Sequence, residues 1–289
     1  MFKPFWVSSS GRNWPGLIAG ALCLLSAWIG LPSVESALGQ DNVREQKTIR
    51  VLMLGDQGHH RPADLYRVLG PALRPYGIEL TYSEDVATSL SANRLSEFDT
   101  LLIYANIDQL DAPQEKAMLD YVAQGHGIVP LHCASYCFRN SKAYVELVGA
   151  QFKEHGGERF VTHILEPLHP IMQGFGGFES WDETYVHHMH NSKDRIVLEE
   201  RRQGKLAADT KAEPWTWVRT HGKGRVFYTA WGHNMDTWSN PGFHNLVARG
   251  ITWASQKDPT KLPAFKDTSR FDIPKMTAVR KDVAPFSYT

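Results

Sequence analysis

Two adjacent histidines follow the first apolar segment of this sequence. The run 49–54 predicts a buried strand, and the loop after it carries Asp56, His59, His60 and Arg61. In α/β proteins, the loops that follow strands usually carry the binding and catalytic groups. Imidazole and carboxylate side chains in such a loop can transfer protons or hold a divalent metal ion.

Other segments bring similar groups to the ends of predicted strands. They are Asn106 after the strand predicted over 99–104, His132 at the end of the one over 127–132, Trp231 and His233 after the one over 225–230, and Glu183 in a loop predicted over 181–190. A single histidine at a strand end is more often a hydrogen-bonded structural group than a catalyst. Because several separate segments converge on one sheet edge, we select His60, His132, Glu183 and His233 as candidate catalytic residues.

This candidate set supports two kinds of chemistry. The neutral imidazoles of His60, His132 and His233, together with a carboxylate, can hold Zn²⁺ or another divalent ion and leave a position open for substrate. Alternatively, histidine and glutamate act directly as general base and general acid. The sequence has no His-Glu-x-x-His motif, and it also lacks Gly-x-Gly-x-x-Gly after the first strand, a P-loop and Gly-x-Ser-x-Gly. Both kinds of chemistry stay open, whereas nucleotide binding and serine hydrolysis lack their usual motifs.

Each candidate residue has a predicted role. Glu183 or His132 is the base, while His60 and His233 stabilise charge or bind metal. The predicted substrate-binding residues are Asp56, His59, Arg61, Asn106, Trp231 and Trp238. The two tryptophans lie beside histidine segments, where an aromatic ring suits the apolar face of a sugar, although core packing explains a tryptophan equally well.

The segment Pro-Leu-His-Cys-Ala-Ser, 130–135, has the form of a strand followed by a sharp turn. Cys133 at such a turn is a candidate nucleophile, since a helix N-terminus lowers the pKa of a thiol. The turn lacks the flanking glycines that usually relieve crowding there, so we favour a buried thiol packed under the turn. The rival interpretation, a cysteine-dependent amidase or hydrolase, predicts that Cys133→Ala is inactive.

The elements that must position these groups alternate between strand and helix up to residue 149. The predicted strands are 48–54, 78–82, 99–104 and 127–132, and the predicted helices are 62–73, 112–124 and one that begins at Tyr144. Alternation of this kind favours a mostly parallel sheet covered by helices on both faces. Further along, the predictions are a strand over 160–165, a hairpin of 215–220 and 225–230, and a helix over 243–255. We therefore expect one α/β domain over 48–255 and an extended tail over 256–289.

The N-terminal segment differs from the rest in composition. Lys3 and Arg12 precede the apolar run 14–31, and Ala-Leu-Gly at 37–39 fits a cleavage site between small residues. We expect residues 1–39 to be a signal peptide, so that the protein is exported to the periplasm or secreted. The alternative is a membrane anchor formed by 14–31, which is close to the minimum spanning length. Cleavage leaves 29 basic and 30 acidic residues, and a near-neutral chain without a basic block gives no support to nucleic-acid binding.

The sequence resembles the trehalose-utilisation (ThuA-like) family, within the class I glutamine amidotransferase-like superfamily. The resemblance covers about 48–255 and rests on GDQGHHRP, YVAQGHGIVPLHCAS, HPIMQGFGGFESWDETYV and GKGRVFYTAWGHNMDTWSNPGFHNLVARGITWA. It implies a flavodoxin-like three-layer α/β sandwich and a role in sugar metabolism, with chemistry on glycosides oxidised at ring carbon 3. His132, the Asp182-Glu183 pair and Gly232-His233 match positions of the family. Family members commonly carry alanine where Cys133 stands, and the His-Glu pair of the amidotransferases has no clear counterpart at the end of this chain.

These observations predict an exported enzyme of sugar metabolism. It would be a lyase or hydrolase that acts on a glycoside or 3-keto-glycoside through a His/Glu pocket at the sheet edge. The alternative is a non-catalytic carbohydrate-binding or accessory subunit that works beside a sugar dehydrogenase. The predicted partner is thus a carbohydrate and, on the alternative, a dehydrogenase as well. The sequence leaves open the sugar, the presence of a divalent metal and whether the protein forms a homo-oligomer.

Overall fold

The computed structural model describes residues 47–202 and 212–267, which lie within one compact unit. The predicted signal peptide, 1–39, lies outside the described residues, as does the part of the predicted tail from 268 onward. Within the described ranges, none of the helices combines the length and the apolar character that a membrane span requires.

A mostly parallel sheet forms the centre of the described domain, as predicted. In spatial order its strands are β2 (Ile78–Ser83), β1 (Ile49–Leu54), β3 (Thr100–Ile103), β4 (Gly127–Pro130), β10 (Gly224–Thr229), β9 (Ala212–His221), β8 (Arg195–Arg202) and β6 (His163–Ile164). The five strands from β2 to β10 run parallel, and the other three pair antiparallel at one side. Every residue of β3 and β4 is buried, as expected for parallel strands that are covered on both faces.

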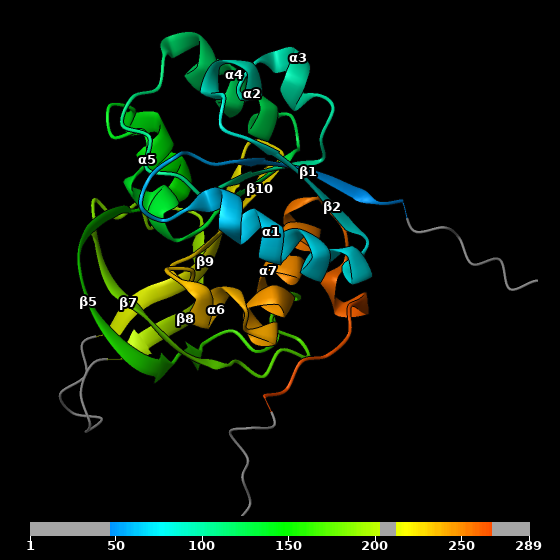
Figure 1. Cartoon of the computed structure of the whole chain (residues 1–289), viewed down its shortest axis with the longest axis vertical. Helices are drawn as coiled ribbons and strands as arrows, with labels where there is room; N and C mark the ends of the chain where they lie inside the picture. Colours follow the sequence, from blue (N-terminus) through cyan, green and yellow to red (C-terminus); the bar gives the residue numbers. More distant parts are fainter. Residues whose placement is uncertain (1–46, 203–211, 268–289) are drawn as a thin grey trace, which may run out of the picture. The chain divides into compact units, whose positions relative to one another are not determined.

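Helices cover both faces of this sheet, which gives the three-layer α/β sandwich (Figure 1). One face carries α1 (Pro62–Leu73), α6 (Met235–Trp238) and α7 (Pro241–Ala254), and the other carries α2 (Val86–Ser89), α3 (Ala92–Leu95), α4 (Ala112–Ala123) and α5 (Lys142–Val148). Single 3₁₀ turns occupy Arg74–Tyr76, His132–Tyr136 and Pro259–Lys261. In α1 the buried leucines 65, 69 and 73 recur every four residues and so form one apolar stripe against the sheet.

The region after residue 150 corrects two predictions. The predicted strand 160–165 is divided between the end of β5 (Gln151–Val161) and β6, which belong to different sheets. The predicted loop 181–190 is instead largely strand β7 (Glu179–His188), which pairs antiparallel with β5 in a separate two-stranded ribbon. Most of β7 is buried on both faces. Its polar and aromatic residues therefore show no clean alternation, and the sequence pattern of a strand is lost.

The first part of the predicted tail lies against the domain. Arg249 of α7 is fully buried and donates hydrogen bonds to the carbonyl oxygens of Gln173 (2.7 Å), Pro259 (3.2 Å) and Pro263 (2.9 Å). Phe265 then pairs with Phe175 in an isolated bridge. A guanidinium group with its donors used in this way fixes the segment that follows α7.

Candidate functional site: a His/Glu cluster at the sheet edge

The loops after four parallel strands meet at one edge of the central sheet. The strand order β2-β1-β3-β4-β10 has its reversal point between β1 and β3, which is where flavodoxin-like sheets bind their ligands. His60 lies in the loop after β1 and Asn106 follows β3, while His132 and His233 follow β4 and β10. The parallel arrangement brings these residues together although they are up to 173 positions apart in the chain.

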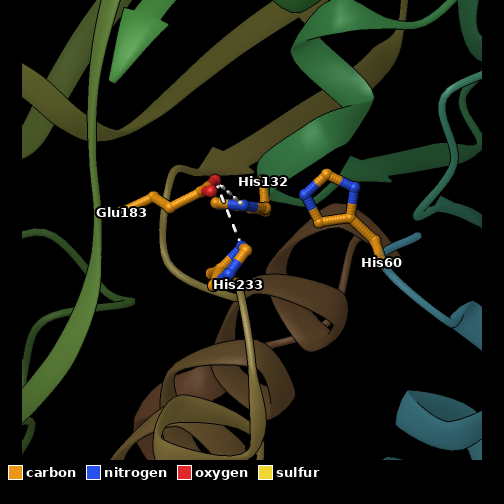
Figure 2. A group of neighbouring side chains, drawn as sticks. All are labelled: His60, His132, Glu183 and His233. Atoms are coloured by element: carbon orange, nitrogen blue, oxygen red, sulfur yellow. Dashed lines mark ion pairs between the residues drawn. The ribbon is translucent and has the colours of Figure 1, made fainter. Parts of the chain in front are cut away.

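Four of the candidate residues form a compact cluster (Figure 2). His60, His132, Glu183 and His233 each contribute an atom able to bind metal, and these atoms all lie within 4.8 Å of one another. The centroid of the His60 ring is 5.2 Å from that of His132 and 5.5 Å from that of His233. His132 is fully buried, and only the His233 side chain, at 26%, retains substantial exposure. Glu183 reaches the cluster from β7, so the two-stranded ribbon supplies the carboxylate.

His132 occupies the sharp turn after β4 in a left-handed conformation, with φ of 46°. Such a conformation is uncommon for a residue other than glycine and typically marks a functional turn. Its Nδ1 lies 2.7 Å from the carbonyl oxygen of Ala230, which only accepts, so Nδ1 carries the proton. Its other ring nitrogen, Nε2, faces Glu183, at 3.2 Å from Oε2. A backbone carbonyl that orients one histidine nitrogen in this way is typical of metal-binding histidines.

Glu183 links the imidazoles electrostatically. Its Oε2 lies 3.1 Å from His233 Nδ1, and its Oε1 lies 3.4 Å from Nδ1 of His155 on β5. Burial raises the pKa of Glu183, but its contacts with His132 and His233 outweigh burial, and the net shift is downward. The same contact with Glu183 raises the pKa of His233. Glu183 is therefore a carboxylate at neutral pH, and its charge favours protonation of His233.

The buried nitrogens of the cluster lack hydrogen-bond partners. Both ring nitrogens of His60, Nε2 of His132 and Nδ1 of His233 are buried and make no hydrogen bond of good geometry. Burial, reinforced by repulsion from His132 and His59, lowers the pKa of His60 to about 3, so this ring is neutral at pH 7. Unpaired nitrogen lone pairs that converge beside a carboxylate match the ligand set of Zn²⁺ and similar divalent ions.

Asp182 is a residue of this site that the sequence prediction did not select. Its side chain is fully buried, and its two oxygens accept hydrogen bonds from four donors. These are the backbone N–H groups of Glu183 (2.8 Å), Gly232 (2.9 Å) and His233 (3.2 Å) and the hydroxyl of Thr237 (2.7 Å). Asp182 therefore joins β7 to the loop that carries His233. The available signal was the family resemblance, which matches the Asp182-Glu183 pair as a whole.

Gly232 allows that loop to pass close to His132. It has φ of 137°, and a Cβ atom added there would lie only 3.2 Å from Cβ of His132. A side chain at this position would strain both the backbone and the packing. The conformation of Gly232 therefore places the His233 ring. Asp182 fixes this part of the loop, because it accepts hydrogen bonds from the backbone N–H groups of both Gly232 and His233.

Asp56, His59 and Arg61 of the first loop were predicted to bind substrate, and the structure gives each of them different neighbours. Asp56 accepts hydrogen bonds from the backbone N–H groups of Gly58 (2.7 Å) and Asn106, so it ties the His60 loop to the loop after β3. The His59 ring packs on His60, with centroids 4.0 Å apart, and lines a cavity beside the cluster. Arg61 is exposed, forms an ion pair with Asp64 of α1 and does not line that cavity.

The two tryptophans predicted to bind substrate are core residues, which corrects that prediction. Trp231 is fully buried and stacks on Phe160 with ring centroids 4.5 Å apart. Trp238 is only 4% exposed, and its Nε1 donates to the carbonyl oxygen of Gly232 at 2.6 Å. Neither ring offers a face to a ligand in this structure, because their large apolar surfaces are used in packing. The aromatic residues that do line the cavity are Tyr136, Phe152 and Tyr185.

Cys133 follows His132 in the 3₁₀ turn, and its side chain is fully buried in the core. Burial raises the pKa of this thiol well above its ordinary value. A nucleophilic cysteine needs the opposite environment, since the thiolate is the reactive form. In this turn the left-handed conformation belongs to His132, and Cys133 is not among the residues with positive φ.

We expect Cys133→Ala to keep most of its activity and its cluster geometry. The substitution removes one buried sulfur and should lower the free energy of unfolding by about 1–2 kcal/mol. Activity assays and thermal unfolding of the variant check this expectation, and alkylation of the native protein should label Cys133 only slowly. Complete loss of activity in a folded Cys133→Ala variant would instead support a cysteine-dependent enzyme.

The fold and the site define the class of this protein: a flavodoxin-like α/β sandwich with a His/Glu cluster at the ligand-binding edge of its sheet. A family model described as "Trehalose utilisation" matches residues 50–254. The protein therefore belongs to the ThuA family, as its sequence motifs predicted. Comparison with curated protein sequences gives no match.

Solved structures of similar fold agree with this assignment. A ThuA-like protein from Parabacteroides merdae superposes with a TM-score of 0.62 at 19% identity, covering 75% of this chain and 94% of the other. A ThuA-like protein from Bacteroides uniformis gives 0.60 at 16% identity, covering 74% and 96%. A β-galactosidase from Bacillus circulans sp. alkalophilus gives 0.51 at 13% identity, but only 32% of its length is matched. At these identities the likeness shows the fold alone.

Proposed function

We propose that this protein is a sugar-processing enzyme, a lyase or hydrolase that acts on a glycoside or 3-keto-glycoside with the help of a divalent metal ion. The observation that carries the proposal is the set of unpaired, buried nitrogens of His60, His132 and His233 around the Glu183 carboxylate. Membership of a family that serves sugar utilisation supports the substrate class. A metal held there would stabilise negative charge that develops on a substrate oxygen.

The residues of this chain would prepare the site in distinct ways. The carbonyl of Ala230 fixes the His132 tautomer, and burial keeps His60 neutral. Asp182 holds the His233 loop, and Asn106 and His59 lie in the wall of the adjoining cavity. A ketone at ring carbon 3 acidifies the neighbouring C–H bond, so a nearby base and a group that stabilises the enolate would together favour elimination.

Direct acid–base catalysis without metal is the second candidate. It is favoured by the contact of Glu183 with His233, which raises the pKa of His233 and so favours a protonated imidazole beside the carboxylate. Glu183 would then accept a proton from substrate, while His233 would donate one to a leaving oxygen.

Elemental analysis of the purified protein separates the two mechanisms. For the metal enzyme we expect a near-stoichiometric divalent ion, in a preparation never exposed to chelator, that is lost in His132→Ala. His126→Ala is the control, because this histidine packs on Tyr121 away from the cluster. Absence of metal from the native protein would overturn the metal proposal and leave direct catalysis. Full activity of His132→Ala on the true substrate would overturn the metal mechanism, and full activity of Glu183→Gln would overturn both.

A non-catalytic accessory subunit beside a sugar dehydrogenase is the alternative from a different class. It predicts binding of a sugar without turnover and little effect of Glu183→Gln on that binding. We also propose export of the protein, since residues 1–39 have the composition of a signal peptide. The N-terminal residue of the protein isolated from its own cells tests this, and an intact Met1 in a soluble cell fraction would contradict it.

A further inference from the structure

A small cavity adjoins the His/Glu cluster, and its lining combines polar and aromatic side chains. Its volume is about 130 Å³, and it is lined by His59, His60, Asn106, Tyr136, Phe152, His155, Glu183 and Tyr185. Glu183 and His60 thus belong both to the cluster and to the cavity wall. A molecule bound in the cavity lies directly against the candidate metal ligands.

The polar groups of this cavity select hydrogen-bond donors. Asn106 Oδ1 is buried and has no hydrogen-bond partner, and the backbone of Asn106 is fixed through its N–H bond to Asp56. An unsatisfied buried acceptor favours a ligand that brings an O–H or N–H group. Glu183 adds negative charge to the same wall.

The charges around the cavity disfavour an anionic ligand. Among its described lining residues there is no lysine or arginine. Arg139 lies over the Tyr136 ring, but its guanidinium is already paired with Asp108 and with the Tyr136 hydroxyl. A phosphate or carboxylate group would therefore meet a carboxylate and an amide oxygen, with no lysine or arginine in the described wall to offset them.

Three aromatic side chains, Tyr136, Phe152 and Tyr185, also line the cavity. Phe152 is half-buried and packs between Tyr185, with ring centroids 4.4 Å apart, and Tyr136, at 5.3 Å. Because both neighbours hold the ring, its orientation is set before a ligand arrives, and little conformational entropy is lost on binding. An aromatic surface opposite hydrogen-bond acceptors suits a ring with an apolar C–H face and hydroxyl groups at its edge.

The size of the cavity limits what it can enclose. Pockets that surround a whole drug-sized ligand usually measure about 300–1,000 Å³, which is more than twice the volume found here. His155 at the mouth has a side chain that is 44% exposed, so the cavity opens to solvent on that side. The enclosed space therefore fits one sugar ring, and a second ring of a disaccharide would lie outside, past His59 and His155.

We infer that this cavity is the binding subsite for one uncharged sugar ring, held between Phe152 and Asn106 beside the His/Glu cluster. This inference rests on the proposed sugar-processing function and deepens it. It identifies Phe152 and Asn106 as ligand-contacting residues, and it predicts that neutral sugars bind more tightly than sugar phosphates.

Calorimetric titration of the purified protein with methyl α-D-glucopyranoside, trehalose and glucose 6-phosphate tests the subsite. We expect the two neutral sugars to bind with similar affinity and the phosphate at least about tenfold more weakly. Phe152→Ala and Asn106→Ala should each weaken binding of the neutral sugars about tenfold, through loss of ring contact and of one hydrogen bond. Their metal content should equal that of the native protein.

Tyr66→Ala is the matched control. Tyr66 is also a half-buried aromatic residue stacked on a tyrosine, Tyr82, at 5.2 Å, but it lines a separate depression between α1 and β2. Its substitution should leave sugar affinity unchanged. Native affinity in both Phe152→Ala and Asn106→Ala would overturn the subsite, and so would preferred binding of glucose 6-phosphate or no binding of any neutral sugar. Binding of neutral sugars that depends on Phe152, but without turnover, would overturn the enzymatic proposal and leave the subsite standing.

Discussion

Glu183→Gln should abolish metal binding and activity while the protein stays folded. The amide has nearly the same shape, but it removes the negative charge that faces His132 Nε2 and His233 Nδ1 at 3.2 and 3.1 Å. Groups that merely orient a metal ligand contribute roughly 10–100-fold to metal affinity, so loss of a charged ligand should weaken binding of Co²⁺, used as a spectroscopic probe, by more than about 100-fold. Optical titration with Co²⁺ and activity assays measure the two effects.

Glu183→Gln should also change the pKa of His233, and this change can be measured without metal. Glu183 raises the pKa of His233, so removal of its charge should lower that pKa toward the ordinary value for histidine. NMR titration of the metal-free protein would show the shift. Glu179→Gln is the control, since Glu179 also lies on β7 but its side chain is 47% exposed and forms an ion pair with Arg159 at 3.8 Å, outside the cluster. Unchanged Co²⁺ affinity in Glu183→Gln would contradict the metal centre.

Asp182→Asn should destabilise the protein and also loosen the site. An asparagine retains one acceptor oxygen, so at least two of the four present donors would face an N–H₂ group. Leaving two buried donors unpaired should lower the free energy of unfolding by about 2–4 kcal/mol, and the midpoint of thermal unfolding by roughly 5–12 °C. Because His233 loses its backbone anchor, Co²⁺ affinity should fall roughly 10–100-fold. Thermal unfolding and Co²⁺ titration give the two quantities.

Glu199→Gln is the matched control for Asp182→Asn, because it separates a loss of stability from a loss of Co²⁺ affinity. Glu199 is also fully buried, and its oxygens accept from the hydroxyls of Thr162 and Thr216, both at 2.6 Å, in a part of the sheet that does not contact the cluster. Burial raises the pKa of both Asp182 and Glu199. We expect Glu199→Gln to change thermal stability alone. Equal loss of Co²⁺ affinity in both variants would show that Asp182 acts only through general stability.

Much of the site could be predicted because the central sheet obeys local rules. Strands such as β1, β3 and β4 are short apolar runs, and their helices begin and end at recognisable residues, for example Pro62 at the start of α1. Parallel strands joined by helices must bring their carboxyl ends to one edge. His60, Asn106 and His132 could therefore be assigned to one place from sequence order alone.

The remaining features depend on contacts between distant segments. Glu183 lies on a ribbon whose pairing joins residues 151–161 to 179–188, and such pairing depends on what covers each face rather than on local propensity. The burial of Trp231 also depends on distant segments. Its neighbours Phe160 and Phe178 cover the ring, whereas its closeness to a histidine in the sequence says nothing about burial. The sequence by itself determined the sheet, its reactive edge and the residue types that meet there. Only the tertiary structure decided that a strand, β7, carries Glu183 to the cluster, that Asp182 anchors the loop of His233 and that Phe152 lines the adjoining cavity, because non-local packing places these three side chains.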